Sequence, residues 1–168
     1  MLDKYKRWKI MRFNVVLVSL LPLLITGCAA VSTEDIERAK AESIPIIVSK
    51  LDTSRPNSAG GVDVEVNFMN TSNKTFKYVV LTVLPYNRVG DVAPSEIGRK
   101  TSARLSATGP IQPGQGAHSS IWSNIWYNHS IHCVELTGIE LTYMNGSTER
   151  LVGRYELFKT LGSVDNCS

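Results

Sequence analysis

The chain has 168 residues, of which 43% are hydrophobic and 20% charged, and its formal net charge is +3. Residues 1–27 hold five of the 18 basic residues and one of the 15 acidic residues, which leaves 13 basic and 14 acidic residues in the remainder, a net charge of about −1. A nearly neutral body lacks the basic surface that nucleic-acid binding requires, and its length suits one domain with its own core.

The N-terminus has the pattern of an export signal. Basic residues from Lys4 to Arg12 precede an apolar run from Phe13 to Ile25, and these are the charged and hydrophobic regions of a signal peptide. The run is shorter than the about 20 apolar residues that span a bilayer, and Pro22 removes a backbone donor within it. The sequence therefore favours a signal peptide over a permanent membrane helix, whether translation begins at Met1 or at Met11.

The apolar run ends in Ile25-Thr26-Gly27-Cys28-Ala29, which resembles the bacterial lipobox. In that motif an aliphatic residue and two small residues fit the signal peptidase, and the cysteine that follows receives a diacylglycerol through a thioether. The resemblance implies that residues 1–27 are removed and that acyl chains such as palmitate anchor Cys28 in a membrane, since two or three chains bind durably. It also implies the cell envelope and, with Ala29 after the cysteine, the periplasmic face of the outer membrane if the cell is Gram-negative.

Two cysteines remain after lipidation, Cys133 and Cys167. An even pair in a chain exported to an oxidising compartment favours a disulfide, with two free thiols as the alternative. On the chain-entropy model this bond would stabilise the fold by roughly 3 to 4 kcal/mol.

Residues 28–43 are expected to form a lipid-anchored spacer that includes a short helix. Ser32 can cap the helix, and Glu34 and Asp35 place negative charge in its first turn. The apolar face of this segment is thin, so a spacer is favoured over a helix that contributes to the core.

Residues 44–168 are predicted to form an all-β domain. Residues 62–68 alternate valine or phenylalanine with polar residues, which indicates a half-buried strand, and residues 75–87 are nearly all apolar, which indicates a central strand. The predicted strands are 44–51, 62–68, 75–87, 99–108, 117–126, 133–143 and 149–157. Gly109–Gly114 predicts a turn, and Asn145-Gly146 predicts a hairpin. About seven short strands without a crossover helix favour an antiparallel, immunoglobulin-like β-sandwich, with a small barrel as the alternative.

Several motifs resemble the immunoglobulin-like, FxLYD-type domains of bacterial secreted proteins and lipoproteins. They cover most of residues 62–148 and are Asn70–Thr75, Val79–Val83, Pro85-Tyr86-Asn87 with Gly90-Asp91, Thr108–Ile111 with Pro113-Gly114, Trp122, Trp126-Tyr127 and Asn145-Gly146. The resemblance implies the sandwich fold but no particular activity, because sandwiches host unrelated functions.

Motifs for catalysis or metal binding are scarce. His129, His132 and Cys133 lie close together, but they lack a usual zinc spacing and a second ligand pair, so ordinary loop histidines are favoured and no metal is expected. There is no G-x-S-x-G nucleophile elbow. We therefore expect no catalytic residue, no cofactor and no enzymatic activity. The Asn-x-Ser/Thr triplets would be glycosylation acceptors only in a eukaryotic secretory route, and they begin at Asn70, Asn73, Asn128 and Asn145.

Trp122, Trp126 and Tyr127 are candidate ligand-binding aromatics, because aromatic faces can stack on sugars. Trp122 and Trp126 share one face of a straight strand, and their burial in the core is the favoured alternative. Four basic residues are expected to form a solvated face rather than an anion site, namely Lys77, Arg99, Lys100 and Arg104.

The sequence thus favours a non-catalytic binding or assembly module of the cell envelope, with a protein or an envelope polymer as partner. Two alternatives stay open. A small envelope hydrolase would need a polar cleft containing His129 or His132, and a carbohydrate-binding module would need Trp122 or Trp126 exposed.

Overall fold

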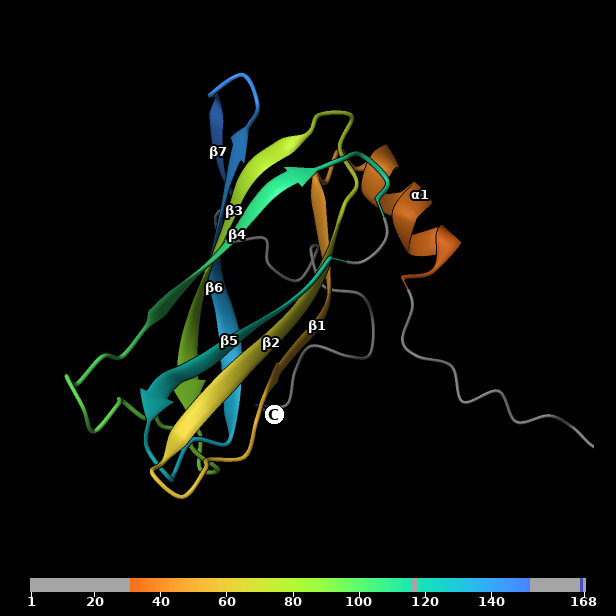
Figure 1. Ribbon diagram of the computed structural model, residues 1–168. Helices are drawn as coiled ribbons and strands as arrows, with labels where there is room; N and C mark the ends of the chain where they lie inside the picture. The colour runs from red at the N-terminus through yellow and green to blue at the C-terminus, as the bar shows by residue number, and fades with distance from the viewer. Residues whose placement is uncertain (1–30, 116–117, 152–166, 168) are drawn as a thin grey trace, which may run out of the picture.

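The computed structural model describes residues 31–115, 118–151 and 167. The predicted signal peptide, Cys28 and the part of the last predicted strand beyond residue 151 lie outside these residues. The described chain contains one helix and seven strands (Figure 1), which are α1 (Thr33–Ala41), β1 (Ile46–Thr53), β2 (Gly61–Asn70), β3 (Phe76–Tyr86), β4 (Ala103–Ile111), β5 (His118–Tyr127), β6 (Cys133–Tyr143) and β7 (Thr148–Leu151).

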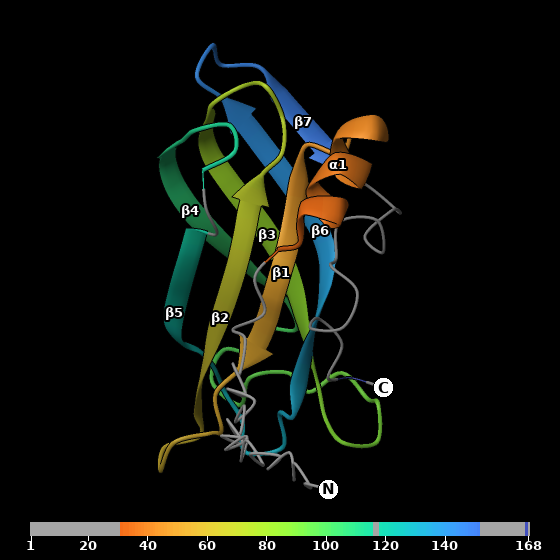
Figure 2. The same cartoon turned by 90° about the vertical axis from the view of Figure 1, so that its right-hand side faces the viewer.

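The strands form two antiparallel sheets that pack face to face (Figures 1 and 2). One sheet has the order β1-β2-β5 and the other has the order β4-β3-β6-β7. The predicted all-β sandwich is confirmed, and because β4 and β5 belong to different sheets the strands do not close into a barrel. The fourth strand pairs with the third here, whereas in immunoglobulin constant-type domains it joins the sheet of the first two.

Alternation along the two central strands builds the core. Val62, Val64, Val66 and Phe68 of β2 are fully buried, while the residues between them are partly exposed. The same period of two appears in β3, where alternate residues are again fully buried. Because successive side chains of a strand point to opposite faces, this pattern leaves each sheet with one apolar face turned toward the other.

The turn predicted over residues 109–114 is shorter than expected, because β4 continues through Gly109 and Pro110 to Ile111. In the register of β3 with β4, Phe76 lies opposite Ile111 and Tyr78 lies opposite Thr108, so one residue of β3 faces two residues of β4. This bulge lies on an edge strand, where a proline without an N–H is tolerated. A Cβ atom added at Gly109 would overlap the carbonyl oxygen of Phe76, so glycine allows the close approach of the two strands.

Helix α1 lies against one side of the sandwich (Figure 2). The hydroxyl of Ser32 accepts a hydrogen bond from the N–H of Asp35 at 3.1 Å, so the predicted N-cap is present. Ala39 is buried in the core cluster together with Ile44, whereas most other residues of α1 are exposed. The helix therefore packs on the sandwich through one small side chain. No described helix is long and apolar enough to cross a membrane.

Tyr143 closes the core at the end of the sandwich that carries the β6–β7 hairpin. Its ring packs edge-on against Phe76 with 5.6 Å between centroids, and the Nζ atom of Lys74 lies 5.1 Å from its centroid. Its hydroxyl donates a hydrogen bond of 2.5 Å to Oε2 of Glu149. Burial of the phenol, the hydrogen bond to Glu149 and the negative charge of that carboxylate raise the pKa of Tyr143 above its ordinary value of 10.0.

This raised pKa predicts a loss of stability in alkali. Above about pH 10 the unfolded chain releases the phenolic proton while the folded protein still holds it, so the free energy of unfolding should fall with pH by up to about 1.4 kcal/mol per unit. Tyr143→Phe removes this contribution and should show a shallower decline in urea unfolding measured from pH 8 to 11. The decline should not vanish, because Glu135 also raises the pKa of Tyr86, mainly through a hydrogen bond. Equal slopes in the two proteins would contradict the prediction.

Candidate functional site

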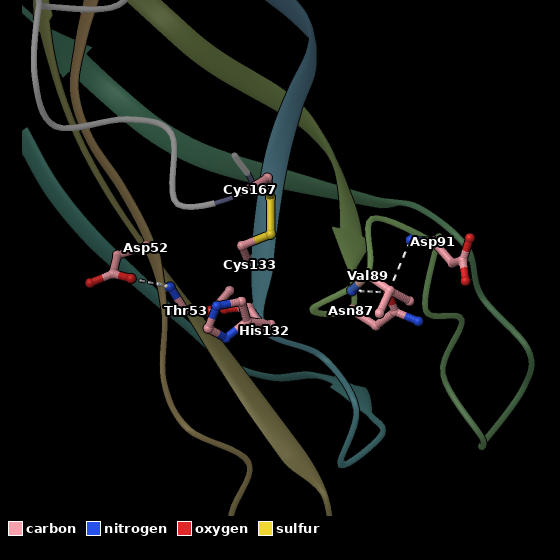
Figure 3. The surroundings of a disulfide bond; sticks show 8 residues. All are labelled: Asp52, Thr53, Asn87, Val89, Asp91, His132, Cys133 and Cys167. Atoms are coloured by element: carbon pink, nitrogen blue, oxygen red, sulfur yellow. Dashed lines mark hydrogen bonds between the residues drawn. A yellow bond between two sulfur atoms is a disulfide. The ribbon is translucent and has the colours of Figure 1, made fainter.

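A cleft of about 830 Å³ opens at the end of the sandwich toward which β1 runs, away from the C-terminal end of α1. Its lining comes from three connections that follow β1, β3 and β5, namely residues Thr53–Pro56, Asn87–Val89 and His129–His132. Figure 3 shows Thr53 beside His132, with Asn87 and Val89 farther along the same end. The volume lies within the range of about 300 to 1,000 Å³ that is usual for ligand pockets.

The side chain of Asn87 holds the turn after β3. Its Oδ1 atom accepts hydrogen bonds from the N–H groups of Val89 at 3.0 Å and Asp91 at 2.9 Å (Figure 3). Such an Asx turn replaces main-chain hydrogen bonds with side-chain ones and fixes the loop conformation. The carboxamide oxygen of Asn87 is thereby occupied, which leaves its NH₂ group as a donor on the cleft wall.

Asn128 holds the connection between β5 and β6. Its Oδ1 atom accepts hydrogen bonds from both the N–H and the hydroxyl of Ser130, each at 2.8 Å. Its Nδ2 atom donates to the carbonyl of Pro94 at 2.8 Å, which ties this connection to the segment before β4. The N–H of His132 donates to the carbonyl of Tyr86 at 2.8 Å, so this wall is also joined to the end of β3.

The same turn occurs in three Asn-x-Ser triplets. In each, the asparagine oxygen accepts from both the N–H and the hydroxyl of the serine two residues later. The triplets are Asn70–Ser72, Asn128–Ser130 and Asn145–Ser147. The sequence predicts a hairpin at Asn145-Gly146, and the structure shows that the asparagine side chain shapes the turn in all three triplets.

Among the described residues, the cleft lining carries positive charge and no carboxylate. Its charged members are Arg55 and Arg88, and it also includes His129 and His132. Within the described part of the chain neither arginine forms an ion pair or a side-chain hydrogen bond, whereas most other basic residues pair with a carboxylate or lie over an aromatic ring. The two guanidinium groups are therefore available to bind an anion.

A disulfide joins Cys133 to Cys167 next to the cleft, in agreement with the prediction (Figure 3). Their Cα atoms lie 5.4 Å apart, and Cys133 directly follows His132. Because its sulfur is bonded to Cys167, Cys133 offers no thiolate to a metal beside His129 and His132. The bond ties the C-terminal tail to the first residue of β6.

The three predicted aromatics do not gather on one ligand surface. The indole of Trp126 is fully buried in the core, which is the alternative that sequence analysis favoured. Trp122 is partly buried against the core, and its Nε1 atom donates to the carbonyl of Ser106 at 3.3 Å. Tyr127 is half-buried, and none of the three lines the cleft.

The basic residues predicted to form a solvated face also lie outside the cleft lining. Lys77, Arg99, Lys100 and Arg104 are exposed, and Arg104 lies 3.7 Å from Glu140. Arg55 and Arg88, which do line the cleft, were not singled out from the sequence. Each is the second residue after the end of a strand, and only the topology of the sandwich brings them to the same end.

Comparisons with known proteins add little to this description. No protein-family model and no curated protein matches the chain. Among solved structures, the 1.85 Å X-ray structure of a hypothetical protein from Peptoclostridium difficile 630 is similar over 67% of this chain and 89% of that one, with 11% sequence identity and a TM-score of 0.43. This similarity is too low to inform function.

The turn at Asn128 predicts a measurable effect on stability. Asn128→Ala removes the two bonds to Ser130 and the bond to Pro94, and we expect it to lower the free energy of unfolding by about 1 to 3 kcal/mol in urea. Asn145→Ala is the matched control, since it removes the same pair of bonds at an exposed turn without a link to a second segment. We expect the control to cost less than about 1 kcal/mol. Equal losses in the two variants would show that the link to Pro94 does not stabilise the cleft wall.

Proposed function

We propose that the protein is a lipid-anchored, non-catalytic binding module of the bacterial cell envelope, and that the cleft is its binding site. The lipobox at Ile25–Ala29, at the end of a basic and apolar leader, is the observation that carries the proposal. Its partners are the membrane, through lipid on Cys28, and an envelope polymer or protein in the cleft.

The position of α1 supports this arrangement. Thr33 follows Cys28 by five positions, a reach of at most about 18 Å, so the anchor keeps α1 near the bilayer. The cleft lies at the other end of strands that are 8 to 11 residues long, a distance of roughly 25 to 35 Å. An anchored molecule would therefore present the cleft to the space beyond its own membrane surface.

The lining of the cleft favours binding over hydrolysis. A hydrolase would need a nucleophile activated by His129 or His132. The hydroxyl oxygen of Ser54 accepts the N–H of Asp63, and the hydroxyl of Ser130 donates to Asn128. The nearby hydroxyls thus serve to hold the loops. Trp126 is fully buried and Trp122 is partly buried, so the two rings do not form a flat exposed pair on which a sugar could stack.

Lipid anchoring is tested at Cys28. Wild-type cells should incorporate labelled palmitate into the protein and retain it in the envelope fraction, whereas Cys28→Ser should lose the label, because no other thiol follows the signal sequence directly. Cys167→Ser should keep the label, which would place the lipid on Cys28 rather than on another cysteine. An unlabelled wild type, or a Cys28→Ser protein that still fractionates with membranes, would overturn the anchoring proposal.

The binding role is tested by photo-crosslinking in living cells. Val89 lines the cleft and is 80% exposed, while Ile121 lies on β5 outside it and is 65% exposed. A photoreactive residue at 89 should yield a defined crosslinked species, and the same residue at 121 should not. Identical products at both positions, or none at 89, would contradict the assignment of the cleft as the binding site.

A further inference from the structure

We infer that the cleft recognises phosphate groups, carried either by an anionic envelope polymer or by phospholipid headgroups. This inference rests on the proposed function in taking the cleft as the binding site. It adds the chemistry of the ligand, which neither the lipobox nor the fold specifies.

Charge is the first argument. Arg55 and Arg88 bring two permanent positive charges to the lining. Asp52 and Asp91 adjoin these loops in the described chain without lining the cleft, and Figure 3 shows the carboxylate of Asp91 pointing away from Asn87. Asp52 also accepts a hydrogen bond from the N–H of Thr53 at 2.8 Å. An anion in the cleft would therefore meet positive charge without a competing carboxylate in the lining.

The balance of donors and acceptors is the second argument. The guanidinium groups donate only, and the oxygen of Asn87 is already occupied by two N–H groups, so its NH₂ group remains as a donor. Donors thus come from at least two walls of the cleft. A phosphodiester group carries two charged oxygens and two weaker ester acceptors arranged as a tetrahedron, so donors on different walls can reach it together, and arginine pairs with phosphate through two parallel hydrogen bonds. A carboxylate also accepts two such bonds, but it holds both oxygens in one plane.

Size and composition are the third argument. A volume of about 830 Å³ greatly exceeds that of a single phosphate, so the cleft has room for a larger molecule that carries the group. The described lining holds no Phe, Tyr or Trp, and its apolar members are Pro56, Val89 and Ile131. Protein interfaces usually depend on buried Trp, Tyr or Arg anchors, whereas this lining offers no Trp or Tyr and its two arginines are exposed. A polyanion fits the cleft better than a folded partner does.

Two sources share this chemistry. A soluble polymer would thread through the open cleft, whereas a membrane would also contact the exposed apolar residues of the connection between β3 and β4, which are Val89, Val92 and Ile97. The experiment therefore needs one arm for each source.

The mature lipidated protein is reconstituted into phosphatidylcholine vesicles, so that its anchor is already occupied. One arm measures capture of fluorescent poly(glycerol phosphate), and the other measures docking of a second vesicle population made of equal parts phosphatidylcholine and phosphatidylglycerol. At least one arm should show binding that weakens as salt is added, because salt screens exposed charges. Binding in either arm supports the inference and identifies the source.

Charge-removing variants locate the site. The double variant Arg55→Gln and Arg88→Gln should bind the responding probe about tenfold or more weakly, as expected for the loss of hydrogen bonds to a charged group. Arg99→Gln is the matched control, because Arg99 is exposed, lies outside the lining and should change binding by less than about twofold. All three arginines are exposed, so their replacement should leave thermal unfolding nearly unchanged.

Three results would overturn the inference. They are no binding in either arm, an equal effect of Arg99→Gln and the double variant, and equally tight binding of polyglutamate matched in charge, which would show that the site does not prefer phosphate. None of these results bears on palmitate labelling at Cys28 or on the crosslink at position 89. Failure of the phosphate inference is therefore distinguishable from failure of the proposed function.

Discussion

The alternation of buried and exposed residues along β2 and β3 is the constraint on which the rest of the structure depends. Each of these strands is central in its sheet, so its register determines how the neighbouring strands on both sides are placed. A shift of one residue would turn the buried valines of β2 to solvent and bring Asp63 and Glu65 into the core. The cost of burying those carboxylates fixes the register, and with it the length and position of each connection.

Antiparallel order then decides which connections meet. The chain reverses direction at each turn, so the connections after β1, β3 and β5 lie at one end of the sandwich and those after β2, β4 and β6 lie at the other. The first set forms the cationic cleft, and the last of the second set joins β6 to β7, the strands that contain Tyr143 and its partner Glu149. The two ends of the sandwich therefore differ. The end beside α1 closes the core, and the cleft end presents charged side chains on turns that asparagine side chains stabilise.

The sequence was sufficient for the architecture because its strongest signal, a period of two, is local. All seven predicted strands correspond to observed ones, and the N-cap at Ser32 was readable from residue type alone. The end of β4 was predicted wrongly because Gly109-Pro110 has the composition of a turn, and only the register against β3 shows that it forms a bulge on an edge strand. Composition at such a place cannot distinguish a turn from an interrupted strand.

The candidate site was less predictable because its residues are distant in sequence. His129 and His132 attracted attention as a local cluster, but Arg55 and Arg88 each stand alone in the chain and carry no motif. A rule based on topology would have found them, since residues that follow odd-numbered strands of an antiparallel sandwich share one end. For the aromatic pair the sequence favoured burial in the core, and the reason is local. Trp122 and Trp126 lie close in sequence and pair with the inward-facing Val64 and Val62, so the same alternation that builds the core draws them into it.

Rigidity links the fold to the proposed binding role. Cys133 pairs with Tyr86 in the sheet and is bonded to Cys167, so the first residue of β6 is held from two sides. The preceding residue, His132, is fixed through its N–H to the carbonyl of Tyr86, and the turn at Asn87 begins one residue farther along. The walls of the cleft are therefore set before any ligand arrives. Ordering loops on binding costs free energy, so a preformed cleft can bind its ligand through a few arginine contacts. The side chains of Arg55 and Arg88 are then the main groups that lose freedom when the ligand binds.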